Sequence, residues 1–187
     1  MAIDLERART DYIAGSLGGF PALLVHGCGW LILTAGFLWA GTAGHDVRWP
    51  ALGLILMGAI TLPASFLLQA ALNLPATSVS NPINLLSPAA ALALPATLPA
   101  LLIVLALEPA YVAAVYAVLT GAHYLPFAWI QRTRWYITLG LGCVAIGGLT
   151  ALVLRADGSA AACVLVGALH LVVAFAVRAK ARRAPAA

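Results

Sequence analysis

Charged residues are scarce in this sequence. Lys and Arg account for 10 of its 187 residues and Asp and Glu for 6, which is 9% together, whereas soluble domains carry about 25%. Hydrophobic residues make up 63% of the chain. Such a chain cannot cover itself with polar surface in water, so the composition excludes an ordinary soluble domain and predicts an integral membrane protein.

Cysteine is also scarce, and the short motifs of soluble enzymes are absent. Cys28, Cys143 and Cys163 form no CxxC pair and no Cys/His zinc spacing, which argues against a disulfide framework. The sequence has no GxxxxGKS/T, HExxH or GxSxG motif, so it points to no known soluble chemistry. We therefore expect no cofactor. We also expect no nucleic-acid partner, because a membrane anchor explains the basic C-terminal cluster.

The apolar stretches predict an all-α bundle of six transmembrane helices within one domain, residues 1–187. Each stretch approaches the roughly 20 residues that cross about 30 Å of hydrocarbon. The expected spans are 20–40, 50–72, 86–107, 109–130, 135–154 and 160–177. Pro88, Pro95 and Pro99 would kink or split the third span, so five spans plus a re-entrant segment is the alternative.

The basic residues predict the orientation of the bundle, because they are retained on the cytoplasmic side. Six spans place only Arg48 and Arg155 on one side. The other side receives Arg7, Arg9, Arg132, Arg134, Arg178, Lys180, Arg182 and Arg183. We therefore expect a multi-pass protein of a bacterial inner membrane, with a short N-terminal segment (1–18) and a basic tail (178–187) both in the cytoplasm. The first 18 residues do not resemble a cleaved signal peptide.

Small residues line one face of each of the last three spans. They let helix backbones approach closely, which must supply much of the helix association in lipid. These residues are Ala113, Ala117, Gly121, Gly140, Gly147, Gly167 and Ala174. The same faces would serve contacts between copies in a homo-oligomer as well as contacts within one chain.

Polar residues within the predicted spans gather at one depth. His26, His123 and His170 each lie seven or eight residues from the cytoplasmic ends of their helices, roughly 10 to 12 Å deep at 1.5 Å per residue, and Cys143 and Ser65 lie at a similar depth. Helical spacing places each on a small or polar stripe. We hypothesise that these stripes converge on a polar cavity in the cytoplasmic half, although single interhelical hydrogen bonds would explain an isolated His equally well.

Two segments carry a resemblance to a known family. The sequence Gly121-Ala122-His123-Tyr124-Leu125-Pro126, together with Asn81-Pro82-Ile83-Asn84, resembles the bacterial membrane proteins of the domain-of-unknown-function family numbered 7010. The resemblance implies no known activity. His26 and His170 match no part of that pattern.

The loop from residue 75 to residue 87 is polar but uncharged, which is unusual for a cytoplasmic loop under the positive-inside bias. One explanation is that the loop dips back into the bundle beside His123, with Asn and Ser side chains satisfying its backbone. The other is an ordinary short polar loop.

These features favour a protein that binds or transports a small molecule or lipid over an enzyme. The alternative is an intramembrane enzyme with His123 as general acid or base and Tyr124, Arg132 or Arg134 holding an anionic headgroup; no catalytic residue is assigned. The candidate ligand-binding residues are His123, Asn81, Asn84, Gln69, Ser65, Thr120, Tyr124, Arg132, Cys143, His26 and His170. We expect no metal, the less favoured alternative being a site formed by His26, His123 and His170.

Overall fold

The computed structural model describes residues 4–183, and within that range the chain consists of helices joined by turns and loops, with no strand. Six of its helical stretches are long and apolar enough to cross a membrane, as the sequence predicts. Their main helices are α2 (Phe20–Ala43), α3 (Arg48–Ala71), the broken pair α4 (Ile83–Ala91) and α5 (Leu98–Leu107), α6 (Val112–Ile130), α7 (Trp135–Leu149) and α8 (Ser159–Arg183). Short turns extend three of the stretches to Leu5–Ala43, Pro109–Ile130 and Trp135–Leu154, and the first also contains a helix before α2. Residues 1–3 of the expected N-terminal segment and 184–187 of the expected basic tail lie outside the described residues.

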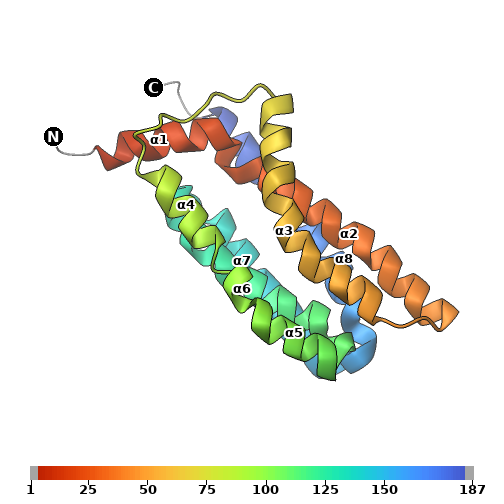
Figure 1. Cartoon of the computed structure of the whole chain (residues 1–187). Coiled ribbons are helices and arrows are strands. Elements are labelled where there is room, and N and C mark those ends of the chain that lie inside the picture. The colour runs from red at the N-terminus through yellow and green to blue at the C-terminus, as the bar shows by residue number, and fades with distance from the viewer. Residues whose placement is uncertain (1–3, 184–187) are drawn as a thin grey trace.

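The helices form two groups, α2 with α3 and α8, and α4 to α7 (Figure 1). The closest pairs are α2 with α8 and α6 with α7, and α7 and α8 join the groups. Small residues allow these approaches: a Cβ added to Gly147 would lie 2.5 Å from the carbonyl oxygen of Ala114. The small residues that the sequence places on inward faces are therefore buried between helices.

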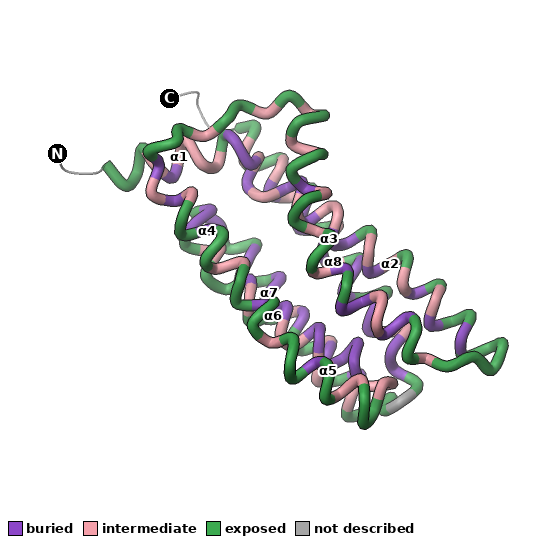
Figure 2. Tube along the Cα trace, viewed as in Figure 1, coloured by how far each residue is buried: buried purple, intermediate pink, exposed green. Residues whose placement is uncertain are grey.

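The exposure of residues to the surroundings differs between the inner and outer faces of the helices. Buried residues lie along the inner faces of the helices and exposed ones along the outer faces (Figure 2). The exposed residues of the outer faces include many large apolar side chains, such as Ile32, Leu67 and Leu152. This surface is suited to hydrocarbon rather than to water.

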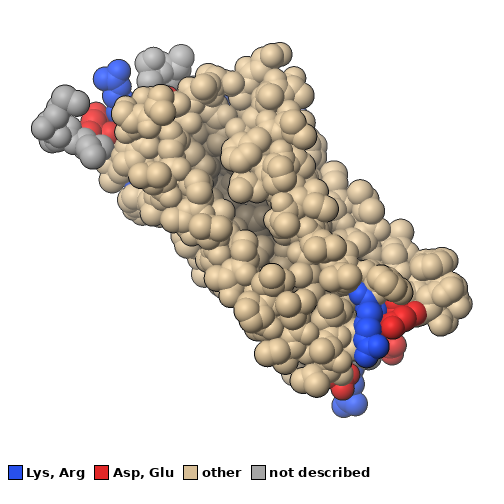
Figure 3. All heavy atoms as spheres, in the orientation of Figure 1, with Lys and Arg blue, Asp and Glu red and all other residues tan. Residues whose placement is uncertain are grey.

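Charge is confined to the two ends of the bundle, and the face shown in Figure 3 carries none between them. We call one end the basic end, because it carries Arg7, Arg9, Arg132, Arg134, Arg178, Lys180, Arg182 and Arg183. The opposite end carries Asp46, Arg48, Glu108, Arg155 and Asp157. Both described ends of the chain lie at the basic end (Figure 1).

A further helix, α1 (Leu5–Ser16), precedes the first span and lies across the basic end (Figure 1). The carboxylate of Asp4 caps it by accepting the backbone N–H groups of Glu6 and Arg7, each at 3.1 Å. The chain then turns sharply at Gly18 and Gly19, whose φ angles are +68° and +84°. Only glycine adopts these angles without strain.

The third span is split, as its prolines predict. α4 ends at Ala91, a short 3₁₀ turn covers Pro95–Thr97, and α5 begins at Leu98. The two halves together still form one of the six spans, residues 83–107. The alternative with five spans is therefore not supported, and the preceding loop runs across the basic end beside α1 rather than into the bundle (Figure 1).

Candidate functional site

A cavity of about 620 Å³ lies between the two groups of helices, in the half nearest the basic end. Its wall comes from α1, α2, α3, α4, α6 and the first turn of α7. The polar residues of the wall are Tyr12, Ser16, His26, Thr61, Ser65, Gln69, Thr77, Asn84, Ser87, His123, Tyr124, Gln131 and Tyr136. None of the described lining residues is Asp, Glu, Lys or Arg.

The cavity opens sideways between α3 and α4. These two helices hardly touch, whereas α3 packs on α2, α5 and α6, and the hollow is visible on the molecular surface in Figure 3. Pro63 lies inside α3 and removes a backbone hydrogen bond there; the C-terminal half of the helix turns away from the direction of its first half (Figure 1). Leu62, Phe66 and Leu92 line the cavity and are also 45%, 56% and 64% exposed, so they form an apolar mouth toward lipid.

His26 lies at the deep end of the cavity, which is the end furthest from the basic end. Its Nδ1 is 3.2 Å from Oγ1 of Thr61, and that hydroxyl donates its own hydrogen to the carbonyl of Met57 at 2.8 Å. The imidazole Nδ1 must therefore be the donor to Thr61, which leaves Nε2 of the neutral ring as an acceptor. Nε2 has no hydrogen-bond partner, and the His26 residue is only 3% exposed.

Aromatic and imidazole rings pack behind His26. The His26 and His170 rings are stacked with centroids 5.0 Å apart, and Tyr124 lies edge-on to His170 at 5.3 Å. Tyr116 packs beside His26, and its hydroxyl, which has no partner, points toward Gly58 on the cavity wall. This cluster of rings therefore supports the cavity wall at its deep end.

His123 occupies the middle of the wall. It is half-buried, lies near the backbone carbonyl of Ala90 in α4, and packs against Tyr124 and Phe127. Its Nδ1 has no hydrogen-bond partner. His123 therefore lines the cavity with unused hydrogen-bonding capacity.

The wall near the basic end is a hydrogen-bonded chain that sequence reasoning left out of the site. Gln131 donates from Nε2 to the Ser16 hydroxyl at 3.3 Å, and Ser16 donates to the carbonyl of Tyr12 at 2.8 Å. Oε1 of Gln131 accepts no hydrogen bond, even though the residue is buried and only 4% exposed. Tyr136 donates to the carbonyl of Gly18 at 2.8 Å, which holds α7 against the turn after α1.

Several residues predicted from the sequence lie on the cavity wall and several do not. His26, Ser65, Gln69, Asn84, His123 and Tyr124 line it. His170, Thr120 and Cys143 are buried among helices behind the wall. Asn81 and Arg132 lie at the basic end, outside the cavity.

Asn81 ties the loop between α3 and α4 to α1. Its amide donates to the carbonyl of Ala8 at 2.7 Å and to the carboxylate of Asp11 at 2.8 Å, and the same carboxylate accepts the backbone N–H of Ser78 at 3.1 Å. Tyr12 of α1 also donates to Ser87 of α4 at 2.5 Å. The loop and α1 together close the cavity at the basic end.

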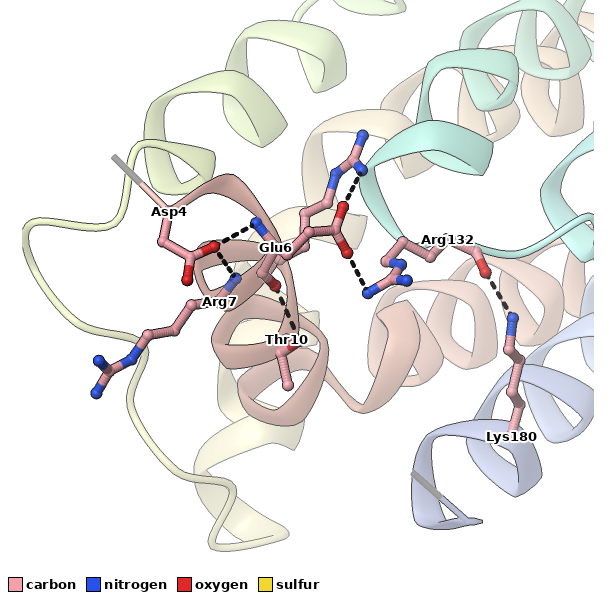
Figure 4. A network of polar contacts seen from close by, with 7 residues as sticks. Asp4, Glu6, Arg7, Thr10, Arg132 and Lys180 are labelled. Atoms are coloured by element: carbon pink, nitrogen blue, oxygen red, sulfur yellow. Dashed lines mark hydrogen bonds and ion pairs between the residues drawn. The ribbon is translucent and has the colours of Figure 1, made fainter. Parts of the chain in front are cut away.

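Arg132 belongs to a surface network rather than to the cavity (Figure 4). Its guanidinium pairs with Glu6 at 2.5 Å, and its backbone carbonyl accepts Lys180 at 2.5 Å. The wall therefore provides no cation for an anionic headgroup, since Arg134 lines a separate groove with Arg132 and Lys180.

The three-histidine metal alternative is not supported by the arrangement. No group of three His, Cys, Asp or Glu side chains in residues 4–183 is placed to hold a metal ion. His26 and His170 stack face to face, and Nδ1 of His170 bonds the carbonyl of Val166 at 2.8 Å. His170 is thus held by its own helix, and His26 is held by Thr61 of α3.

Comparison with known proteins finds one family. Searches of curated proteins and of solved structures gave no match. The model of a family of unknown function, DUF7010, matches residues 5–180. That range contains nearly the whole described chain, including both segments on which the resemblance in the sequence depends. The chain is therefore a multi-pass membrane protein that belongs to the DUF7010 family.

Proposed function

We propose that this protein binds an amphiphilic small molecule or lipid in the cavity between its two groups of helices. The observation that carries the proposal is the combination of an apolar sideways mouth with a polar inner wall. Leu62, Phe66 and Leu92 would contact the hydrocarbon part of a ligand that arrives from the bilayer. His26 and Gln131 offer buried polar atoms that lack partners, and such atoms are costly in an apolar surrounding unless a ligand or water satisfies them.

Labelling from within the membrane tests this proposal. A monoacylglycerol that carries a photoreactive diazirine on its chain would be added to the reconstituted protein and crosslinked by light. We expect adducts on peptides that contain Leu62, Phe66 and Leu92. Uniform labelling of all lipid-facing helices would contradict the proposal.

Two variants of α4 make the labelling specific. Ala91 lines the cavity, whereas Ala89 is exposed two residues earlier and does not. Ala91→Phe should fill the cavity and abolish the adducts at the mouth. Ala89→Phe adds the same ring toward lipid and should leave them unchanged.

Transport of the bound molecule is the further step that the fold would allow, because broken helices and polar groups within the membrane are typical of transporters. We propose that the basic end faces the cytoplasm of a bacterial inner membrane, which would place the cavity in the cytoplasmic leaflet. Accumulation of a solute in proteoliposomes, abolished by Ala91→Phe, would indicate transport. Its absence while labelling persists would indicate a binding protein.

A second candidate function is an intramembrane enzyme with His123 as general acid or base. The unpartnered Nδ1 of His123 on the cavity wall favours it, but no nucleophile and base lie paired there. Arg132 pairs with Glu6 away from the cavity, which removes the expected headgroup cation. Conversion of an added lipid by proteoliposomes, lost in His123→Ala, would establish the enzyme.

A further inference from the structure

We infer that the ligand of the cavity has an uncharged headgroup that donates hydrogen bonds, such as an alcohol or a glycerol ester with free hydroxyls. The inference rests on the proposed function and specifies its ligand class. It follows from the charge of the wall and from the direction of the hydrogen bonds already made there.

The lack of charged residues in the described part of the wall excludes ionic headgroups. None of the described lining residues is acidic, Lys or Arg, so a phosphate would find no cation and an ammonium group no carboxylate. An unpaired charge is strongly disfavoured in such a low-dielectric site. Two basic side chains of the basic end are engaged outside the wall: Arg132 pairs with Glu6, and the Arg9 guanidinium lies 3.6 Å from the centre of the Trp129 ring.

Two buried acceptor atoms on lining residues lack partners, and they favour a headgroup that donates hydrogen bonds. Nδ1 of His26 is committed as a donor to Thr61, which leaves Nε2 as an acceptor. Nε2 of Gln131 donates one of its two hydrogens to Ser16, and Oε1 is an acceptor without a partner. Both free atoms belong to lining residues that are more than nine-tenths buried. A hydroxyl satisfies such atoms, whereas an ether or ketone without a hydrogen leaves them unpaired.

Three probes with the same oleoyl chain separate these properties. They are 1-oleoylglycerol, which has two free hydroxyls, its dimethyl ether, which has none, and 1-oleoyl-lysophosphatidic acid, which is anionic. Binding would be measured by displacement of tritiated oleoylglycerol from the full chain in phosphatidylcholine nanodiscs. We expect oleoylglycerol to bind about tenfold more tightly than either of the other probes, the difference that two modest hydrogen bonds make.

A variant tests whether Gln131 recognises the hydroxyl directly. Gln131→Leu removes the acceptor and should weaken oleoylglycerol several-fold while leaving the affinity of the dimethyl ether unchanged. If Gln131 only supports the fold, the variant would weaken both probes equally, and that result would count against the inference.

The outcomes distinguish this inference from the proposed function. If Ala91→Phe abolishes binding but the ether or the anion binds as well as oleoylglycerol, the cavity binds amphiphiles and the headgroup class is wrong. If no probe shows binding that is sensitive to Ala91→Phe, the proposed function itself is wrong. Preference for the free diol, lost in Gln131→Leu, would support both.

Discussion

At the scale of single residues, the turn between α1 and α2 depends on Gly19. Its φ of +84° strains any residue with a Cβ, and an added Cβ would also collide with the Tyr136 hydroxyl. We predict that Gly19→Ala lowers the free energy of unfolding by about 2 kcal/mol, measured by denaturation in mixed micelles. Gly41→Ala is the control, because a Cβ there meets nothing within 4 Å, and it should be neutral or slightly stabilising.

The sequence predicts which face of a helix some side chains lie on, but not which of their atoms donate or accept hydrogen bonds. Helical spacing places His26 on a small-residue face, and it is buried. Its donor role depends on Thr61, which is 35 residues away on another helix, and no local pattern contains that information. Gln131 follows the last residue of α6, and only its bond to Ser16, 115 residues away in the sequence, shows which of its atoms is free.

At the scale of elements, the pairing of α6 and α7 depends on close backbone approach. A Cβ on Gly147 would lie 2.5 Å from the carbonyl of Ala114, whereas one on Gly148 meets nothing within 4 Å. We predict that Gly147→Ala destabilises the protein by about 1 to 3 kcal/mol and that Gly148→Ala does not. Thermal unfolding in detergent compares the two; equal midpoints would show that the helices can separate without cost.

The contact between α1 and the loop before α4 leads to a second prediction about helix packing. Asn81→Asp would replace an amide donor by a carboxylate next to the carboxylate of Asp11. We expect α1 and the loop to separate, with faster amide hydrogen exchange over residues 5–16 and 78–83 but not in α8. Val79→Asp adds the same charge at a fully exposed position and should leave exchange in α1 unchanged.

Element boundaries follow from the sequence where lipid imposes the length of a helix. All six spans lie close to their predicted positions, because hydrocarbon thickness and flanking polar residues determine both ends. The helix α1 was not predicted, since it is polar and its packing depends on Asn81 in the loop before α4 and on Ser87 in α4, both distant in the sequence. The sequence predicts the break at Pro95 as a kink or split. It does not predict the cavity beside this break, because the cavity also depends on how α3 packs.

At the scale of the whole molecule, the distribution of charge predicts which side of the membrane each end faces. Eight of the ten Lys and Arg residues lie at the basic end, and such a bias orients inner-membrane proteins with that end in the cytoplasm. His45 is exposed at the opposite end and Arg182 at the basic end. These positions allow the two ends to be probed separately.

We predict that a membrane-impermeant maleimide labels His45→Cys in intact spheroplasts and labels Arg182→Cys only after lysis. The wild-type chain is the blank, because Cys143 and Cys163 are buried and Cys28 is exposed only within the membrane-spanning part of α2. The reverse pattern would place the cavity in the outer half of the bilayer. The ligand would then have to enter from the outer leaflet, so this measurement also decides which lipid pool the mouth between α3 and α4 can sample.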